Sequence, residues 1–221
     1  MGLREDKKQQ MRARLYDTAI ELFRTNGFDN TAVREVITAV GVSEPTFYNY
    51  FPTKEAVLDE FAARTLDSVA EQLRTTIDTS SHLESTLREV MAALADVFSN
   101  DPEFMAVVAT RSGMFWGPSG GIIERHLGIY ELLAQLFETA QQRGEVRPEL
   151  DPQQLAETLA GASMVATINC LNDWWGQPDD DLFRRLDQQA DVLLNGCSDS
   201  AFTPAATVDA ADARRGRATR R

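Results

Sequence analysis

The spacing of apolar residues predicts a chain built of helices. From residue 53 to residue 195, apolar side chains recur at intervals of three and four, and no stretch keeps the alternation that a strand would need. Short breaks rich in Ser, Asn, Gly and Pro divide this pattern. We therefore expect an all-α fold with helices near residues 53–77, 82–99, 102–113, 121–143, 152–175 and 179–195.

Two shorter helices are expected between residues 31 and 54. The first has an apolar face made by Val33, Val36, Ile37 and Val40. Gly41 follows where a left-handed C-cap residue is needed. Ser43 and Pro45 suit the start of the second helix, and Thr31 suits the cap of the first. The connection between the two helices is therefore only a few residues long.

The second short helix has an inner side and an outer side of different chemistry. Phe47 and Phe51 are four residues apart and should face inward. The outer side then carries hydrogen-bonding groups and rings, from Glu44, Thr46, Tyr48, Asn49 and Tyr50. Two helices joined by a tight turn in this way are typical of a helix-turn-helix, whose second helix enters the major groove of DNA. A glycine between two amphipathic helices also occurs in bundles that never touch DNA.

The same stretch resembles the signature of the TetR family of bacterial one-component transcriptional regulators. The resemblance lies in Gly41-Val42-Ser43, Thr46-Phe47-Tyr48, Tyr50-Phe51, Lys54-Glu55 and Leu58, and it extends upstream to a first helix over Arg14 to Phe28. Ile37 and Val40 stand where the family usually has alanine, which leaves the fine angle of the second helix open. The close resemblance covers roughly the first quarter of the chain.

The resemblance implies an N-terminal three-helix helix-turn-helix domain over residues 1–54. A C-terminal helical domain for ligand binding and dimerisation would cover residues 55–197. Residues 198–221 are rich in Ala, Asp, Thr and Arg without apolar periodicity, and this composition predicts an arginine-rich, disordered tail. Lys54, at the start of the next helix, is expected on a phosphate, and the Glu44 carboxylate can accept a hydrogen bond from a cytosine amino group. The full set of expected DNA contacts is Thr31, Arg34, Ser43, Glu44, Thr46, Tyr48, Asn49, Tyr50 and Lys54.

The charge of the chain is divided in a way that suits this layout. The net charge is −12, but residues 1–54 carry eight basic and seven acidic side chains, whereas residues 55–213 carry nine and 27. The last eight residues add five arginines, which either add nonspecific DNA affinity or form a solvated end. Phosphates would repel the acidic part, so we expect only the N-terminal module to lie on the duplex.

A pocket for a small apolar or amphipathic effector is expected in the middle of the chain. Methionine and aromatic side chains, which suit varied apolar ligands, are concentrated there. Thr167 or Asn169 could supply a polar contact, and residues 112–121 form either a mobile entrance or an ordinary ordered loop. The expected ligand contacts are Met91, Phe98, Met105, Phe115, Trp116, Phe137, Met164, Asn169 and Trp174.

Two apolar seams in the last helices suggest a dimer. Such seams are usually intramolecular core. In the TetR family, which this sequence resembles, however, they correspond to the helix pair that joins two subunits, so the resemblance implies a homodimer. Such a dimer would bind a palindromic operator whose half-sites are about 34 Å, or a multiple of that, apart. Repression is the family default, and the sequence does not identify the operator or the effector. The expected interface residues are Leu159, Ala162, Ala166, Phe183, Leu186, Ala190 and Leu193.

Other classes of protein fit the sequence less well. His82 and His126 do not pair by spacing with cysteine or carboxylate clusters, and no glycine loop for phosphate lies between a strand and a helix, so we expect no catalytic residues, metal or cofactor. The charged N-terminus and the lack of a long apolar run predict a cytoplasmic protein with no membrane partner and with Cys170 and Cys197 reduced. A helical protein-binding adaptor remains the alternative.

Overall fold

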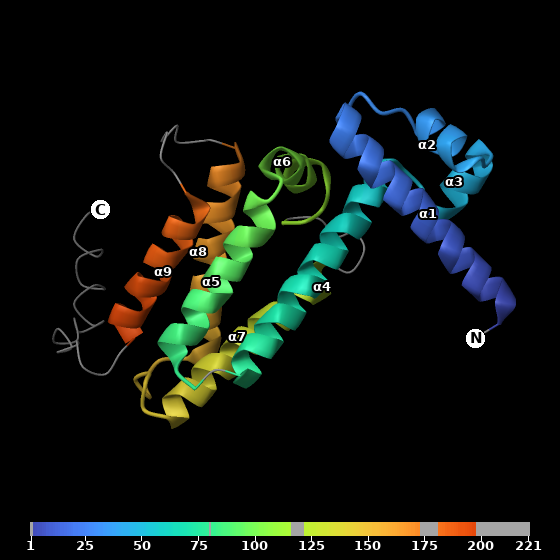
Figure 1. The fold of residues 1–221 in the computed structure, drawn as a ribbon. Coiled ribbons are helices and arrows are strands. Elements are labelled where there is room, and N and C mark those ends of the chain that lie inside the picture. The colour runs from blue at the N-terminus through green and yellow to red at the C-terminus, as the bar shows by residue number, and fades with distance from the viewer. Residues whose placement is uncertain (1, 80, 116–121, 173–180, 198–221) are drawn as a thin grey trace, which may run out of the picture.

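The predicted all-α fold is confirmed in a computed structural model, which describes residues 2–79, 81–115, 122–172 and 181–197. Within these ranges there are helices and no strands. The helices are α1 (Leu3–Asn26), α2 (Val33–Val40), α3 (Glu44–Tyr50), α4 (Glu55–Thr79), α5 (Leu83–Ser99), α6 (Pro102–Arg111), α7 (Ile122–Gln142), α8 (Pro152–Asn172) and α9 (Leu182–Cys197) (Figure 1).

The predicted helix boundaries after residue 53 agree with the structure to within about three residues. Residues 173–175 and 179–180, which were expected to be helical, lie outside the described residues, as do residues 116–121 of the expected loop and the tail from 198 to 221. The first helix begins at Leu3, well before Arg14. Its early residues are good helix formers, and Glu5 and Asp6 lie in the first turn, where acidic side chains favour the helix dipole.

Helices α1 to α3 form a small head around an aromatic core (Figure 1). Phe23 and Phe28 meet edge to face with ring centroids 4.9 Å apart. Phe47 and Phe51 are fully buried, as their spacing predicted. These rings fix the side of α3 that faces inward, and therefore also the side that faces out.

The turn between α2 and α3 is built as predicted at its glycine but not at its caps. Gly41 adopts φ 76° and ψ 41°, and both its amide and that of Val42 donate to the Ile37 carbonyl, at 2.9 and 3.0 Å. A residue with a β-carbon would be strained in this left-handed conformation. The Ser43 hydroxyl, however, does not cap α3; it pairs with the Thr46 hydroxyl at 2.8 Å.

Thr31 does not cap α2 either, so that expectation was wrong. The residue preceding α2 is Ala32, whose amide donates to the Glu35 carboxylate at 2.8 Å. The Thr31 side chain turns back toward α1 and donates to the Gly27 carbonyl at 2.8 Å. The hydroxyl therefore satisfies a carbonyl at the end of α1, and no side chain of the described residues caps the start of α2 through its first-turn amides.

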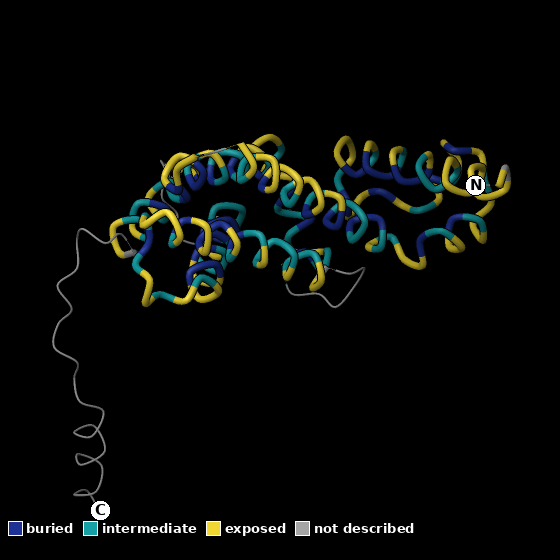
Figure 2. Tube along the Cα trace, turned by 90° about the horizontal axis from the view of Figure 1, so that it is seen from below, coloured by how far each residue is buried: buried dark blue, intermediate teal, exposed yellow. Residues whose placement is uncertain are grey.

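Helix α4 passes from the head into the body, which consists of α4 to α9 (Figure 1). Near its start, Val57 and Leu58 are fully buried, and α4 contacts α1. Farther along, α4 packs against α5, α6 and α7, with Leu66 and Leu73 buried. In the rest of the body α8 packs against α6, α7 and α9, and α9 also packs against α5. Figure 2 shows exposed positions along the outer sides of the helices and buried positions between them.

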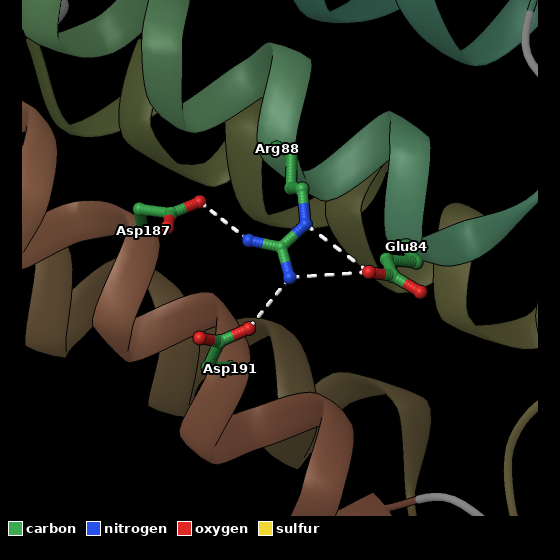
Figure 3. A network of polar contacts seen from close by, with 4 residues as sticks. All are labelled: Glu84, Arg88, Asp187 and Asp191. Atoms are coloured by element: carbon green, nitrogen blue, oxygen red, sulfur yellow. Dashed lines mark hydrogen bonds and ion pairs between the residues drawn. The ribbon is translucent and has the colours of Figure 1, made fainter.

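An ionic cluster joins α5 to α9 at the surface of the body (Figure 3). The Arg88 guanidinium donates to Asp187 at 2.6 Å and to Asp191 at 2.7 Å, both on α9, and also to Glu84 on its own helix at 3.1 Å. The hydrogen bond to Asp187 is the main reason why the pKa of Arg88 lies above its ordinary value, followed by those to Asp191 and Glu84. Arg88 therefore links α5 to α9, the last helix of the body.

We expect Arg88→Met to loosen the contact between α5 and α9, because the variant keeps the apolar stem but leaves three carboxylates without their shared cation. The melting temperature should fall at about 0.01 M salt, and the loss should shrink at about 1 M salt, where exposed charges are screened. Thermal unfolding followed by circular dichroism measures this. Arg74→Met is the control, since Arg74 pairs only within α4, with Glu71; an equal loss in both variants would contradict the expectation.

Candidate DNA interface and ligand cavity

Helix α3 exposes the side chains that were predicted to read DNA. Tyr48 is 43% exposed, and Ser43, Glu44 and Asn49 are exposed as well, whereas Thr46 is half-buried. The Tyr48 ring stands edge to face on the buried Phe47, at 5.5 Å between centroids. The outer side of α3 therefore offers a hydroxyl, an amide and a carboxylate on a helix whose inner side is fixed. Arg34 is exposed on α2.

Lys54 and Thr31 point inward, and their predicted contacts with phosphate disagree with the structure. The Lys54 ammonium donates to the carbonyls of Phe28 at 2.7 Å and Thr31 at 3.1 Å. It also lies over the Phe28 ring, 4.1 Å from the centroid, which adds a cation–π contact. Thr31 is only 1% exposed. Lys54 thus ties the segment between α1 and α2 to the start of α4.

Tyr50 is half-buried, unlike its exposed neighbours Tyr48 and Asn49, so it is displaced from the predicted reading side. Its carbonyl accepts from Arg12 at 2.7 Å. Arg12 also pairs with Glu60 and lies over the Phe51 ring at 4.5 Å. A cation of α1 therefore serves to hold the end of α3.

The early part of α1 carries exposed cations that sequence reasoning missed. Arg4, Lys7 and Lys8 are exposed on this helix, three and four residues apart, so they share one side of it. The sequence signal was this spacing, which becomes visible only once the helix is known to begin at Leu3. These side chains are available to phosphates.

A largely apolar cavity of about 100 Å³ lies between α4, α5, α7 and α8. Among the residues predicted to touch a ligand, four line it: Met91, Phe98, Phe115 and Met164. The rings of Phe98 and Phe115 stack at 6.3 Å. Several lining residues were not predicted, and they include Thr65 on α4, His126 and Tyr130 on α7, and Ser163 on α8.

Three other predicted ligand residues lie away from this cavity. Met105 and Phe137 are buried in the body but do not line it, because a helix has only one face toward a given space. Asn169 lines a groove between α8 and α9, whereas Thr167, two residues earlier and so on another side of the helix, lines the cavity. Trp116 and Trp174 lie outside the described residues.

The groove between α8 and α9 has a volume of about 710 Å³. Leu159, Ala162, Ala166 and Leu193, from the predicted dimer interface, line it. Two residues that were not predicted stand at its surface, Val165 at 51% exposure and Val192 at 76%. Gln189 holds the two helices together by donating to the Ala162 carbonyl at 3.0 Å.

Two predicted interface residues were wrong. Leu186 and Ala190 are fully buried within the single chain, so they have no surface left for a second subunit. Phe183 is 45% exposed but does not line the groove. Half of the predicted seam of α9 is thus intramolecular core.

Contacts around α6 connect the head to the body. Arg24 of α1 pairs with Asp101 at 3.1 Å and lies over the Phe104 ring at 4.9 Å. Arg111, at the end of α6, pairs with Asp29 of the head at 3.0 Å. A change in the position of α6 would therefore alter the contacts of two residues of the head, Arg24 and Asp29.

Tyr16 belongs to the junction between α1 and α4. Arg64 lies 3.8 Å from the centre of its ring. Burial raises the pKa of Tyr16, while the positive charge of Arg64 opposes that rise. Tyr16 therefore remains a neutral phenol at this junction near neutral pH.

The described residues contain neither a membrane-spanning helix nor a metal-binding cluster. None of the helices there combines the length and the apolar content that crossing a bilayer requires. No group of three or more His, Cys, Asp or Glu side chains in the described ranges is arranged to hold a metal ion.

Residues 15–61 match the family described as bacterial regulatory proteins, tetR family. The Escherichia coli HTH-type transcriptional repressor ComR is 30% identical over 152 residues, which cover 65% of this chain and 71% of ComR. YdgC of Bacillus subtilis, described as an uncharacterized HTH-type transcriptional regulator, is 27% identical over 158 residues, 71% of this chain and 79% of YdgC.

A solved structure of similar fold is that of Thermus thermophilus FadR, a TetR family transcriptional repressor in complex with lauroyl-CoA. The TM-score is 0.65 at 24% identity, and the match covers 88% of this chain and 97% of FadR. At this identity the likeness is one of fold. It includes both the head and the body.

We expect Lys54→Met to destabilise the protein by about 1–3 kcal/mol, because two partly buried carbonyls lose a charged donor. Urea unfolding followed by the helical circular dichroism signal measures this free energy. Lys8→Met, at an exposed lysine of α1, should leave stability unchanged. If Lys54→Met lowered DNA affinity without lowering stability, Lys54 would be a phosphate contact after all.

Proposed function

The chain belongs to the tetR family of bacterial regulatory proteins, and we propose that it is a repressor that binds a palindromic operator as a homodimer and leaves it when a small effector binds. Regulators of this family are DNA-binding transcription factors and not enzymes. The observation that carries the proposal is the outer side of α3, where Tyr48 and Asn49 are exposed while Phe47 beneath them is fully buried.

The head, residues 1–54, would place α3 in the major groove. A helix of seven residues reaches only a few base pairs. Thr46, Tyr48 and Asn49 would lie near bases, with Arg34 and Ser43 near bases or backbone, and Glu44 would favour a cytosine amino group. The exposed cations of α1, Arg4, Lys7 and Lys8, would add phosphate contacts.

A homodimer would double these contacts on two half-sites about 34 Å apart. The groove between α8 and α9, with the exposed Val165 and Val192 at its surface, supports a subunit interface at this end of the body. Apolar side chains exposed together are unfavourable in water, and a two-fold axis would cover each of them with its counterpart.

The effector would enter the cavity between α4, α5, α7 and α8. Because its lining is almost wholly apolar, the cavity suits an apolar or amphipathic molecule. Ligand binding there would bias α4 and α6, and the contacts of Arg24 and Arg111 would carry the change to the head. A coupling of about 1–3 kcal/mol would weaken DNA binding by about 5- to 150-fold. ComR is named a repressor, which supports repression here.

We further propose that the protein acts on DNA in the cytoplasm. The experiment that tests the whole function is selection of bound sequences from a random duplex pool, with the purified protein at two salt concentrations. An enriched palindrome would support a dimeric, sequence-specific regulator. Salt-sensitive binding without enrichment would leave only nonspecific attachment, and no binding at all would favour a protein-binding adaptor.

We expect Tyr48→Ala to weaken binding to the selected palindrome by more than about tenfold, because each subunit loses a contact with its half-site. Fluorescence anisotropy of a labelled duplex measures the affinity. Glu138→Ala, at an exposed position of α7 in the body, is the control and should bind as the unchanged chain does. Equal affinity of the two variants would remove α3 from the reading surface.

We expect Val192→Glu to weaken dimerisation by at least about tenfold, because a carboxylate from each subunit would be buried or brought near its counterpart. Sedimentation velocity over a range of concentrations measures the change. Ile123→Glu is the matched control: it changes another exposed aliphatic residue, at 54% exposure, on α7. A Val192→Glu variant that stayed dimeric would place the interface elsewhere.

A further inference from the structure

We propose that the cavity between α4, α5, α7 and α8 takes a compact, uncharged molecule with one hydroxyl group, held by Ser163 and Thr167 of α8. That the molecule is an effector rests on the proposed function, but its binding does not. The inference is carried by the hydrogen-bonding state of these two side chains, by the charge around the cavity and by its size.

Ser163 is a buried hydroxyl with a poor partner. Its side chain is 4% exposed and lines the cavity. The hydroxyl donates to the sulfur of Met91, with 3.6 Å between oxygen and sulfur. A thioether is a weak acceptor, whereas a buried hydroxyl group gains more from an oxygen. A ligand oxygen placed near Ser163 would therefore replace a weak hydrogen bond with a stronger one.

Thr167 supplies the complementary half of the site. It lies one helical turn after Ser163, and its side chain lines the same cavity at 1% exposure. Its hydroxyl already donates to the Ser163 carbonyl at 2.8 Å, so its free lone pair can only accept. One group to donate and one to accept, four residues apart on the same helix, match a hydroxyl group of a ligand, which does both.

The surroundings disfavour a charged ligand. No Lys, Arg, Asp or Glu is among the described residues that line the cavity. His126 lines it, but it is half-exposed, packs near Tyr130 with 6.5 Å between ring centroids, and already has an interaction partner. Residues 55–213 as a whole are strongly acidic. A carboxylate or a coenzyme A phosphate would thus enter an apolar space in a negative field.

The size of the cavity limits the ligand to a compact one. Its volume is about 100 Å³. An engineered apolar cavity of about 150 Å³ holds benzene, so this cavity would take a six-membered ring only if its walls moved slightly outward. The polar half of a long acyl thioester would have no place inside. The site is therefore suited to a ring or short chain that ends in a hydroxyl.

The test is direct binding of four probes to the full chain without DNA, by calorimetry and by saturation-transfer NMR. The probes are phenol, benzene, benzoate and lauroyl-CoA, which separate the hydroxyl, the ring, the negative charge and the acyl-CoA. We expect phenol to bind about threefold to tenfold more tightly than benzene, the gain of about one hydrogen bond. Benzoate and lauroyl-CoA should show no saturable binding at the same concentrations.

Ser163→Ala should lower the ratio of phenol affinity to benzene affinity, because the donor is gone and only the acceptor Thr167 still contacts the phenol hydroxyl. A general loss of structure would change both affinities together and leave the ratio, so the ratio isolates the hydrogen bond. Ser68→Ala, at an exposed serine of α4 that does not line the cavity, should keep the ratio of the unchanged chain.

Three results would overturn the proposal: neither phenol nor benzene binds, the unchanged chain or Ser163→Ala gives a ratio other than that expected, or benzoate or lauroyl-CoA binds more tightly than phenol. Because no DNA is present, these results are independent of the operator selection. If a palindrome is selected but phenol does not bind, the proposed regulatory function stands and the proposed ligand class is wrong. If phenol binds but no DNA does, the ligand class stands and the proposed regulatory function is wrong.

Discussion

The continuity of α4 is the constraint on which the arrangement of head and body depends. The helix has 25 residues and no glycine or proline, so it spans about 37 Å as one stiff element. Val57 and Leu58 at its start are fully buried, and α1 packs against this helix. Leu66 and Leu73 farther along line the cavity. A movement of the part of α4 that lines the cavity is therefore also a movement of the helix that supports the head.

Two of the contacts between the head and the body are exposed ion pairs that could be broken at little cost in free energy. The pairs Arg24–Asp101 and Arg111–Asp29 are substantially exposed, and exposed ion pairs contribute only about 0–1 kcal/mol each. Allosteric coupling free energies are about 1–3 kcal/mol, so they are similar in size to the free energy that these ion pairs contribute. The aromatic core of the head, by contrast, is buried, and its rings contact one another. Such a head would move as a unit and keep its shape.

The regular parts of this fold could be predicted from the sequence, and the directions of single side chains could not. Apolar spacing located the helices, and Gly41 located the turn, because both follow from local geometry. Lys54 was misread because its partners, the carbonyls of Phe28 and Thr31, are more than twenty residues away in the sequence. Leu186 and Ala190 were misread because an intramolecular seam and an intersubunit seam have the same spacing. Ser163 could not be identified from the sequence, because its interest depends on its hydrogen bond to the sulfur of Met91, 72 residues away.

The distribution of basic side chains limits how this head can recognise DNA. Four cations that sequence alone leaves free for phosphates, Arg12, Arg14, Arg24 and Lys54, bind carbonyls or carboxylates within the protein. The other four cations of the head, Arg4, Lys7, Lys8 and Arg34, are exposed, and residues 55–213 are strongly acidic. Each phosphate that one of these cations neutralised would add salt-dependent affinity without regard to sequence, and the acidic body would oppose it by repulsion. In the proposed function, contacts of α3 side chains with base edges would then have to add the sequence-dependent part of the affinity.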